Sequence, residues 1–245
     1  MVATTWSLFP KYLPHENILR DWYIICGAWK WLGKKKVHTC SISAADALRY
    51  SMSGARPPDY EAVAALHAAV QEADFIVGHN GDAFDLKKLN ARVIFHGLPA
   101  LPPIRTVDTL KEARKIAKFS SNRLDYLAGH LVDGGKMSTS YSLWLKIMHG
   151  DEKALRYMLK YNKKDVVELE AVYNRLLPYM KSHPNVNLGP ARDVEGLILE
   201  CPKCGSTHVQ RRGTAKTQTR SYARYQCQGC GSWSKSSSIN GGPLT

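Results

Sequence analysis

Tyr161 and Asp165 are four residues apart within residues 154–179, a segment with the pattern of a helix. Apolar residues recur in it at intervals of three and four, at Leu155, Met158, Leu159, Val166, Leu169, Val172 and Leu176. We expect one helix, or two helices that meet near Tyr161. Side chains four positions apart share a helical face, about one turn from each other. A phenol and a carboxylate placed in this way can hold a metal ion and orient a water molecule. The alternative is a surface acid beside a half-buried tyrosine.

Asp85 is a further candidate, because it follows a short apolar segment and stands at the start of another helix. Residues 74–78 have the composition of a buried strand, and the polar loop 79–85 follows them. In open α/β sheets, functional groups collect at the carboxyl ends of the strands. A late helix that packs across this edge would bring Asp165 towards Asp85.

The elements that would position these side chains alternate between strand and helix. Residues 22–32 and 37–42 are rich in strand-forming residues and predict an antiparallel hairpin. A helix is expected after Pro57-Pro58, with Asp59 as its N-cap. The later elements are a strand over 104–108, helices over 84–96, 110–118 and 124–131, and a loop over 133–142. This order predicts an α/β fold with a mixed sheet flanked by helices.

The chain has 245 residues and a net charge of +13. Its length allows one good-sized domain and a small one. The charge favours a polyanionic partner, with nucleic acid as the leading candidate and anionic lipid as the weaker one. No apolar segment reaches membrane-spanning length, and the N-terminus lacks the layout of a signal peptide. We therefore expect no membrane partner.

The six cysteines fall into two groups. Cys26 and Cys40 lie in apolar, strand-like segments, where buried free thiols are usual. The other four form two Cys-x-x-Cys pairs with metal-ligand spacing, made by Cys201, Cys204, Cys227 and Cys230. Four thiolates suit a closed, tetrahedral zinc site, and an iron centre or a redox pair is the alternative. Free thiols and a thiolate site fit a reducing cytoplasm.

A small zinc ribbon is predicted over residues 197–245, after a linker over 181–196. Gly205 and Gly231 follow the two cysteine pairs and permit the tight turns of such a site. His208 lies near the first pair but is redundant beside four sulfurs. A module of this size builds little core, so the metal is expected to hold it folded.

The predicted ribbon is strongly basic. Residues 201–245 contain seven lysines and arginines and no aspartate or glutamate. The predicted nucleic-acid contacts are Arg211, Arg212, Arg220, Tyr222 and Arg224. Basic residues interleaved with Tyr222, Tyr225 and Trp233 can contact phosphates and stack on bases. The alternative is a ribbon that only docks on the larger domain or on a partner protein.

The order of several short motifs resembles that of RNase H-like DEDD exonucleases, the DnaQ-like 3′–5′ enzymes. The motifs are His79-Asn80 to Phe84-Asp85-Leu86, Val107-Asp108-Thr109-Leu110, Leu124-Asp125-Tyr126-Leu127 and Tyr161-x-x-x-Asp165. The tyrosine matches the Tyr-containing branch. The similarity covers residues 20–180 and is greatest to phage and bacterial members.

The resemblance implies a two-metal mechanism with Mg²⁺ or Mn²⁺ held by four acidic residues. By position, Asp85 and Asp165 would be metal ligands, and Tyr161 would orient the attacking water. His79 and Asn80 would shape the loop or touch substrate. The two remaining motif acids, Asp108 and Asp125, are expected to cap helices.

One departure from the family pattern is serious. The family's first strand carries Asp-x-Glu, and no predicted strand before Asp85 carries it. Two carboxylates facing two divalent ions would leave a net charge of about +2 and weak binding. We favour a natural chain that begins upstream of Met1 with this strand. The alternatives are a degenerate member that binds nucleic acid without cutting it, and substitution by Glu16 or Asp21.

The sequence therefore predicts an RNase H-like domain over residues 1–180, apparently without its first strand, and a C-terminal zinc ribbon. The expected function is metal-dependent 3′–5′ exonuclease activity, with DNA favoured over RNA. The alternatives are non-catalytic nucleic-acid binding and a protein-interaction module. A replication or repair protein is a possible partner, and the resemblance implies a bacterial or phage-infected cytoplasm.

Overall fold

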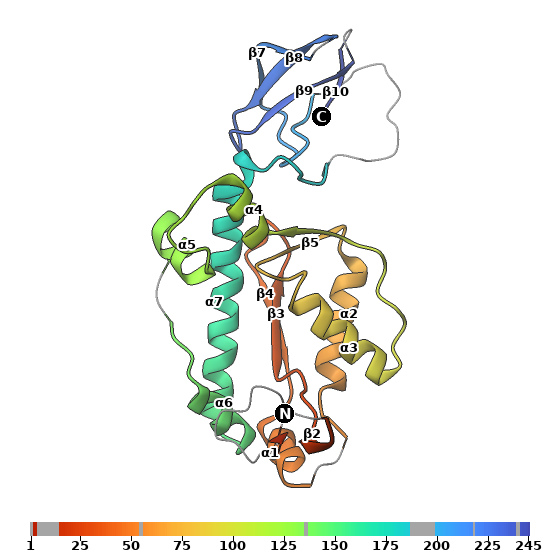
Figure 1. The fold of residues 1–245 in the computed structure, drawn as a ribbon, viewed down its shortest axis with the longest axis vertical. Helices are drawn as coiled ribbons and strands as arrows, with labels where there is room; N and C mark the ends of the chain where they lie inside the picture. Colours follow the sequence, from red (N-terminus) through yellow and green to blue (C-terminus); the bar gives the residue numbers. More distant parts are fainter. Residues whose placement is uncertain are drawn as a thin grey trace.

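The computed structural model describes residues 2–3, 15–53, 56–134, 137–186, 199–217, 219–238 and 241–245. A mixed α/β domain is followed by a small β module that carries the four C-terminal cysteines (Figure 1). This confirms the predicted fold class. No helix in these ranges is both long enough and apolar enough to cross a membrane.

Helix α7, Glu152–Leu176, runs the length of the α/β domain (Figure 1). It is one unbroken helix of 25 residues, so the alternative of two helices meeting near Tyr161 is wrong. Asp151 caps it, accepting hydrogen bonds from the backbone N–H groups of Lys153 (2.8 Å) and Ala154 (3.1 Å). Its buried face contacts β3, α5 and α6, and this packing fixes the direction in which Tyr161 and Asp165 point.

The strands pair in both of the predicted ways. β3 (Cys26–Lys30) and β4 (Val37–Ser41) form the antiparallel hairpin, and β5 (Phe75–Gly78) pairs in parallel with β6 (Arg105–Asp108). These are two separate two-stranded sheets rather than the single mixed sheet that we expected. The reason is that no strand in the described ranges is hydrogen-bonded between β3 and β5. A further short pair joins β1 (Val2–Ala3) to β2 (Ile18–Arg20), next to the 3₁₀ turn η1 (His15–Asn17).

Helices cover both sides of the hairpin, with α2 and α3 on one side and α7 with α5 and α6 on the other (Figure 1). The helices before α7 are α1 (Ala44–Ser53), α2 (Tyr60–Glu72), α3 (Asp85–His96), α4 (Thr109–Ile116), α5 (Leu124–Leu131) and α6 (Tyr141–Met148). Sequence reasoning missed α1 and α6. The signal for α1 was Ser43-x-x-Asp46, a capping pattern in which the Asp46 backbone N–H donates to Ser43 Oγ (3.0 Å).

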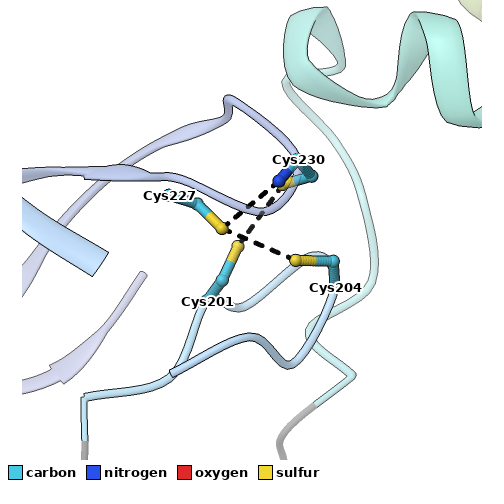
Figure 2. A group of neighbouring side chains, drawn as sticks. All are labelled: Cys201, Cys204, Cys227 and Cys230. Carbon is cyan, nitrogen blue, oxygen red and sulfur yellow. Dashed lines mark hydrogen bonds between the residues drawn. The ribbon is translucent and has the colours of Figure 1, made fainter. Parts of the chain in front are cut away.

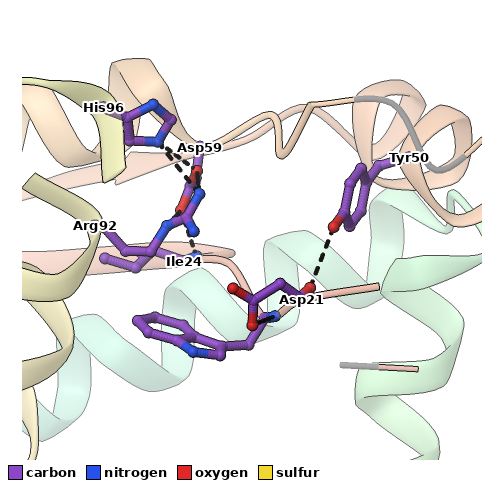
Figure 3. Close-up of polar contacts among 7 residues, drawn as sticks. Asp21, Ile24, Tyr50, Asp59, Arg92 and His96 are labelled. Atoms are coloured by element: carbon purple, nitrogen blue, oxygen red, sulfur yellow. Dashed lines mark hydrogen bonds and ion pairs between the residues drawn. The ribbon is translucent and has the colours of Figure 1, made fainter. Parts of the chain in front are cut away.

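Asp59 holds the N-cap position of α2, as predicted, but its side chain makes no capping hydrogen bond. Its carboxylate is fully buried and accepts hydrogen bonds from Arg92 Nε (2.8 Å), Arg92 Nη2 (2.7 Å) and the Ile24 backbone N–H (2.9 Å) (Figure 3). His96 Nε2 lies 2.8 Å from the same carboxylate. Burial by itself would raise the pKa of Asp59, but these hydrogen bonds outweigh it and lower the pKa. The cluster ties α2, α3 and the segment before β3 together.

Replacing Asp59 with alanine is expected to lower the free energy of unfolding by about 3–5 kcal/mol, because Arg92 would be left buried without its partner. Chemical denaturation of both proteins measures the difference. Asp74→Ala is the matched control, since Asp74 is exposed and a surface change of this kind stays within about 0.5 kcal/mol. An Asp59→Ala protein as stable as the control would contradict a structural role for this cluster.

The C-terminal module is an antiparallel sheet of four strands in the order β10-β9-β8-β7. The strands are β7 (Val209–Lys216), β8 (Ser221–Cys227), β9 (Trp233–Ser238) and β10 (Gly241–Leu244). The predicted linker is described as far as Val186, whose backbone N–H donates to Pro202 O (2.9 Å). Residues 187–196 of that linker lie outside the described ranges.

Candidate functional site

The four cysteines of the two Cys-x-x-Cys pairs converge on one point (Figure 2). Their Sγ atoms all lie within 4.8 Å of one another. Cys201 Sγ is 3.8 Å from Cys230 Sγ, and Cys204 Sγ is 3.6 Å from Cys227 Sγ. A tetrahedral zinc ion with Zn–S bonds of about 2.3 Å separates its sulfurs by about 3.8 Å. The cluster therefore has the size of a tetrathiolate zinc site.

The loops that carry the cysteines have the predicted turn geometry. Gly205 and Gly231 have φ values of +74° and +75°, in the left-handed region that favours glycine. Their backbone N–H groups donate to Cys201 O (2.9 Å) and Cys227 O (3.0 Å). These repeated contacts make two equivalent knuckles that aim their sulfurs inward. Cys204 is exposed as a residue, but its sulfur faces the cluster, and desolvation raises its pKa. Only a cation would allow four thiolates at these separations.

The knuckle end of the ribbon is docked on the end of α7. Lys203 is half-buried and donates from Nζ to Leu177 O (3.3 Å) and Met180 O, two carbonyls in or after the 3₁₀ turn η2 (Leu177–Tyr179). A cation at the carboxyl end of a helix is favourable, because the last carbonyls carry partial negative charge. Cys230 packs against the core cluster that contains Leu177 and Met180. The knuckle end of the ribbon therefore docks on the larger domain.

The loop between β5 and α3 is pinned to the start of α4. Asp108 caps α4, accepting from the Leu110 backbone N–H (3.1 Å), which confirms its predicted role. The same carboxylate accepts from the Asn80 backbone N–H (2.9 Å). Both ring nitrogens of His79 are bonded, to Thr109 Oγ1 and Asn122 O at 2.9 Å each. These contacts support the loop-shaping role predicted for His79. Asn80 is exposed and adopts a φ of +64°, which asparagine tolerates better than most residues.

Asp85 begins α3 directly after this loop. The residue is exposed overall, but protein atoms crowd its carboxyl group, and this desolvation together with the negative charge of Asp108 raises its pKa. Asp85 therefore lies at the carboxyl end of the parallel pair, as predicted.

Tyr161 and Asp165 lie on one face of α7, and a hydrogen-bonding interaction between their side chains contributes to the pKa of each. Desolvation raises the pKa of Asp165 to about 6, with Glu168 and Asp125 adding negative charge and Tyr161 opposing the shift. Desolvation and the charge of Asp165 raise the pKa of Tyr161 to about 12. The phenol therefore stays protonated near neutral pH and donates its hydrogen bond.

Asp125 is the functional candidate that sequence reasoning undervalued. Arg123 holds the cap position of α5, so the predicted cap role of Asp125 is wrong, although Asp125 Oδ1 accepts from the Tyr126 backbone N–H (2.9 Å). Its charge raises the pKa of both Tyr161 and Asp165. Asp125 therefore belongs to the same acidic region as Asp165. Its sequence motif gave the only signal, because the position of Asp125 relative to Asp165 depends on how α5 packs on α7.

The carboxylates do not complete a site for two divalent ions. The negative charges of Asp125 and Glu168 raise the pKa of Asp165. The pKa of Asp85 is raised instead by the negative charge of Asp108. Across the described ranges, the four cysteines are the one group of three or more potential ligands close enough to share an ion. The described carboxylates therefore supply only part of the Mg²⁺ or Mn²⁺ pair that the resemblance implies.

One Asp-x-Glu triplet does precede Asp85, and sequence reasoning overlooked it. Asp59-Tyr60-Glu61 is not on a strand but spans the start of α2. The Asp59 carboxylate is occupied by Arg92 and buried, so it is unable to serve as the missing metal ligand.

The predicted nucleic-acid contacts of the ribbon divide between the two faces of its sheet. Arg224 is opposite Lys235 in β9, and Arg212, whose backbone carbonyl accepts from Arg224 Nε (3.1 Å), lies on the same side. Tyr222 shares this face, because side chains two apart on a strand point the same way. Arg211 is paired with Tyr225 and therefore points to the other face. Arg220 lies in the turn before β8.

Cys26 and Cys40 are free thiols, as predicted. Burial raises the pKa of Cys26 to about 12, so this thiol is not reactive near neutral pH.

Comparison with known proteins adds the family assignment. The family model described as RNase_H superfamily matches residues 34–177, which is more than half of the chain and spans every element from β4 to α7. No curated protein and no solved structure gave a significant match. The matched region includes Asp85, Tyr161 and Asp165 but ends before the cysteine cluster. With its parallel strand pair, antiparallel hairpin and covering helices, this chain belongs to the RNase H superfamily.

Proposed function

We propose that this protein is a nucleic-acid hydrolase of the 3′–5′ exonuclease type, with Asp85, Tyr161 and Asp165 in its active site and DNA as the favoured substrate. The pair of Tyr161 and Asp165, which share one face of helix α7 and interact through their side chains, carries the proposal. Membership of the RNase H superfamily supports a nuclease or nucleic-acid-binding role, and the net charge of +13 suits a polyanionic substrate.

The chemistry assigned to this chain is limited to its own side chains. Tyr161, with its pKa raised to about 12, remains a hydrogen-bond donor at neutral pH and would orient Asp165 and a water molecule. Asp165, with a pKa of about 6, is ionised above that pH and would hold positive charge near the scissile phosphate. We propose Mg²⁺ or Mn²⁺ as the cofactor of the nuclease and Zn²⁺ as the structural ion of the cysteine cluster.

The second candidate is a protein that binds nucleic acid without cutting it. The separate environments of Asp85 and Asp165, and the absence of a third carboxylate close enough to complete a cation site in the described ranges, favour this function. Both candidates share the substrate class and differ in whether a phosphodiester bond is broken.

Incubation with a 5′-labelled single strand and Mg²⁺ or Mn²⁺ distinguishes the two. We expect a ladder of products shortened from the 3′ end, released nucleoside monophosphates, and loss of both in Asp165→Ala. Asp74→Ala, at an exposed position outside the candidate site, is the matched control. Cleavage that survives Asp165→Ala would overturn the site assignment. Salt-sensitive binding without any cleavage by the unaltered chain would establish the non-catalytic function instead.

A further inference from the structure

We propose that one face of the ribbon sheet is a platform for single-stranded nucleic acid, with Trp233 as the stacking residue and Arg224 and Lys235 as phosphate contacts. The inference takes its class of ligand from the proposed function. It uses the strand register to place Trp233 and Lys235 at one site with Arg224, and it leaves out Arg211.

The strand register collects these side chains on one surface. Arg224 is opposite Lys235, and Gln226 is opposite Trp233, so alternation along β8 and β9 puts all four on the same face. Tyr222 joins them, two residues before Arg224. Four residues along β8 separate the Tyr222 position from the Gln226 position, which is about 13 Å. Two aromatic rings therefore stand at the ends of a row with two cations between them.

This face is the outer one. Trp233 is 47% exposed and Arg224 is exposed. The alternate residues of β9 and the loop before it, Ser232, Ser234 and Ser236, are buried. The knuckle end is the part of the ribbon that contacts η2, through Lys203 and Cys230. Docking on the larger domain therefore leaves the outer face open.

The cations are held in place before any ligand arrives. The guanidinium carbon of Arg224 lies 4.8 Å from the ring centre of Trp233, and Arg224 Nε donates to Arg212 O (3.1 Å). Lys235 Nζ lies 4.7 Å from the ring centre of Tyr222. Arg224 covers one face of the indole, and the exposure of Trp233 leaves the rest of the ring for a base. A platform ordered in advance loses less side-chain entropy on binding.

Charge selects the kind of partner. Residues 201–245 carry seven lysines and arginines without one acidic residue, and none of the ion pairs in the described ranges involves this segment. Apart from Lys203, which donates to carbonyls of the larger domain, its cations are therefore available to phosphates. A single strand fits better than a duplex, because only unpaired bases can leave their neighbours and stack on an aromatic ring.

Fluorescence anisotropy of a labelled oligothymidylate, without added divalent metal, tests the platform on the full chain. Trp233→Leu keeps apolar bulk without an aromatic ring and is expected to weaken binding by about 5- to 100-fold, the range for stacking of one base. Trp233→Phe keeps a ring and should retain most of the affinity. The double variant Arg224→Gln/Lys235→Gln should weaken binding and reduce the salt slope by about 1.4, since each lost single-strand phosphate contact removes about 0.7.

Matched controls test whether binding depends on this face of the ribbon or only on the overall positive charge of the chain. Lys35→Gln/Lys36→Gln removes the same charge from the exposed turn after β3, and Trp144→Ala removes another exposed tryptophan. Both should bind as the unaltered chain does. Zinc content equal to that of the unaltered chain shows that each variant keeps its ribbon. Equal affinity of the Leu and Phe variants, equal losses in the controls, or tighter binding of a duplex would each overturn the proposal.

A minimal substrate separates this proposal from the nuclease itself. Asp165 and the end of α7 at Leu176 are eleven residues apart, about 17 Å along the helix, so a mononucleotide ester is too short to reach both sites. Hydrolysis of thymidine 5′-p-nitrophenyl phosphate with Mn²⁺ should be the same in Trp233→Leu as in the unaltered chain. If neither the unaltered chain nor Trp233→Leu hydrolyses this ester, and oligonucleotide binding still depends on Trp233, the exonuclease proposal fails and the platform proposal stands. If the ester is hydrolysed and binding does not depend on Trp233, the platform proposal fails and the exonuclease proposal stands.

Discussion

Replacing Asp165 with asparagine is expected to abolish cleavage and, at the same time, to make the folded protein more stable at pH 8. The pKa of Asp165 is about 6 in the folded protein and 3.8 as its ordinary value, so the folded state binds this proton more tightly than the unfolded state does. The ionised carboxylate therefore opposes folding at every pH above about 6. Asparagine removes that charge but keeps an oxygen that accepts from Tyr161.

The pH dependence of this gain is specific. Between pH 4 and 6 the unaltered protein loses stability, because Asp165 ionises in the unfolded state while the folded state still holds the proton, whereas the asparagine variant has no such loss. The gain should be about 1–2 kcal/mol above pH 6, allowing for the partial exposure of Asp165, and should vanish by pH 4. Thermal unfolding across this range, without added divalent metal, measures it. If the asparagine variant is less stable than the unaltered protein at pH 8, the ionised carboxylate of Asp165 does not destabilise the folded state.

Tyr161→Phe is the matched companion of that experiment, because it removes the hydrogen-bond donor and leaves the charge. Tyr161 opposes the raised pKa of Asp165, so its loss should raise that pKa further and lower stability at pH 8, opposite in sign to the effect of Asp165→Asn. Cleavage should fall in both variants. If Tyr161→Phe cleaves as well as the unaltered chain, the phenol has no part in orienting water.

Removal of metal from the cysteine cluster is expected to unfold the ribbon. Structural zinc contributes about 10–16 kcal/mol in small zinc-dependent modules, far more than a β module with few buried residues gains from packing. One zinc ion per chain should be released by a chelator or by Cys201→Ser, and amide exchange over 201–238 should become fast. His208→Ala is the control, because His208 lies outside the cluster and should leave the zinc content unchanged.

The effect should extend into the larger domain. Cys230 packs against the cluster that includes Leu177 and Met180, and Lys203 satisfies carbonyls beyond the end of α7, so an unfolded ribbon exposes apolar side chains and unpaired backbone oxygens there. The melting temperature of the α/β domain should fall with zinc content. A domain that melts at the same temperature with and without metal would contradict this coupling. Exchange that stays slow in the chelated protein would show that a disulfide pair, not a metal, closes the cluster.

Features that depend on short spacings could be predicted from the amino-acid sequence alone. The common face of Tyr161 and Asp165, the short strand that precedes Asp85, and the left-handed glycines after each cysteine pair all follow from interactions within a few residues. Helical period, strand composition and turn geometry are local properties, so the sequence carries them without knowledge of the fold.

Other features depend on segments that are distant in the chain, and they became clear only from the three-dimensional packing. The sequence predicted a capping role for Asp59, but its buried carboxylate instead accepts hydrogen bonds from Arg92, 33 residues later in the chain. Arg211 and Arg212 looked equivalent until the pairing of β7 with β8 placed Arg211 with Tyr225, on the face away from Trp233. The charge of Asp125 acts on Asp165 only because α5 packs on α7. Burial and strand register are settled by long-range contacts, and these decide which charges share a site.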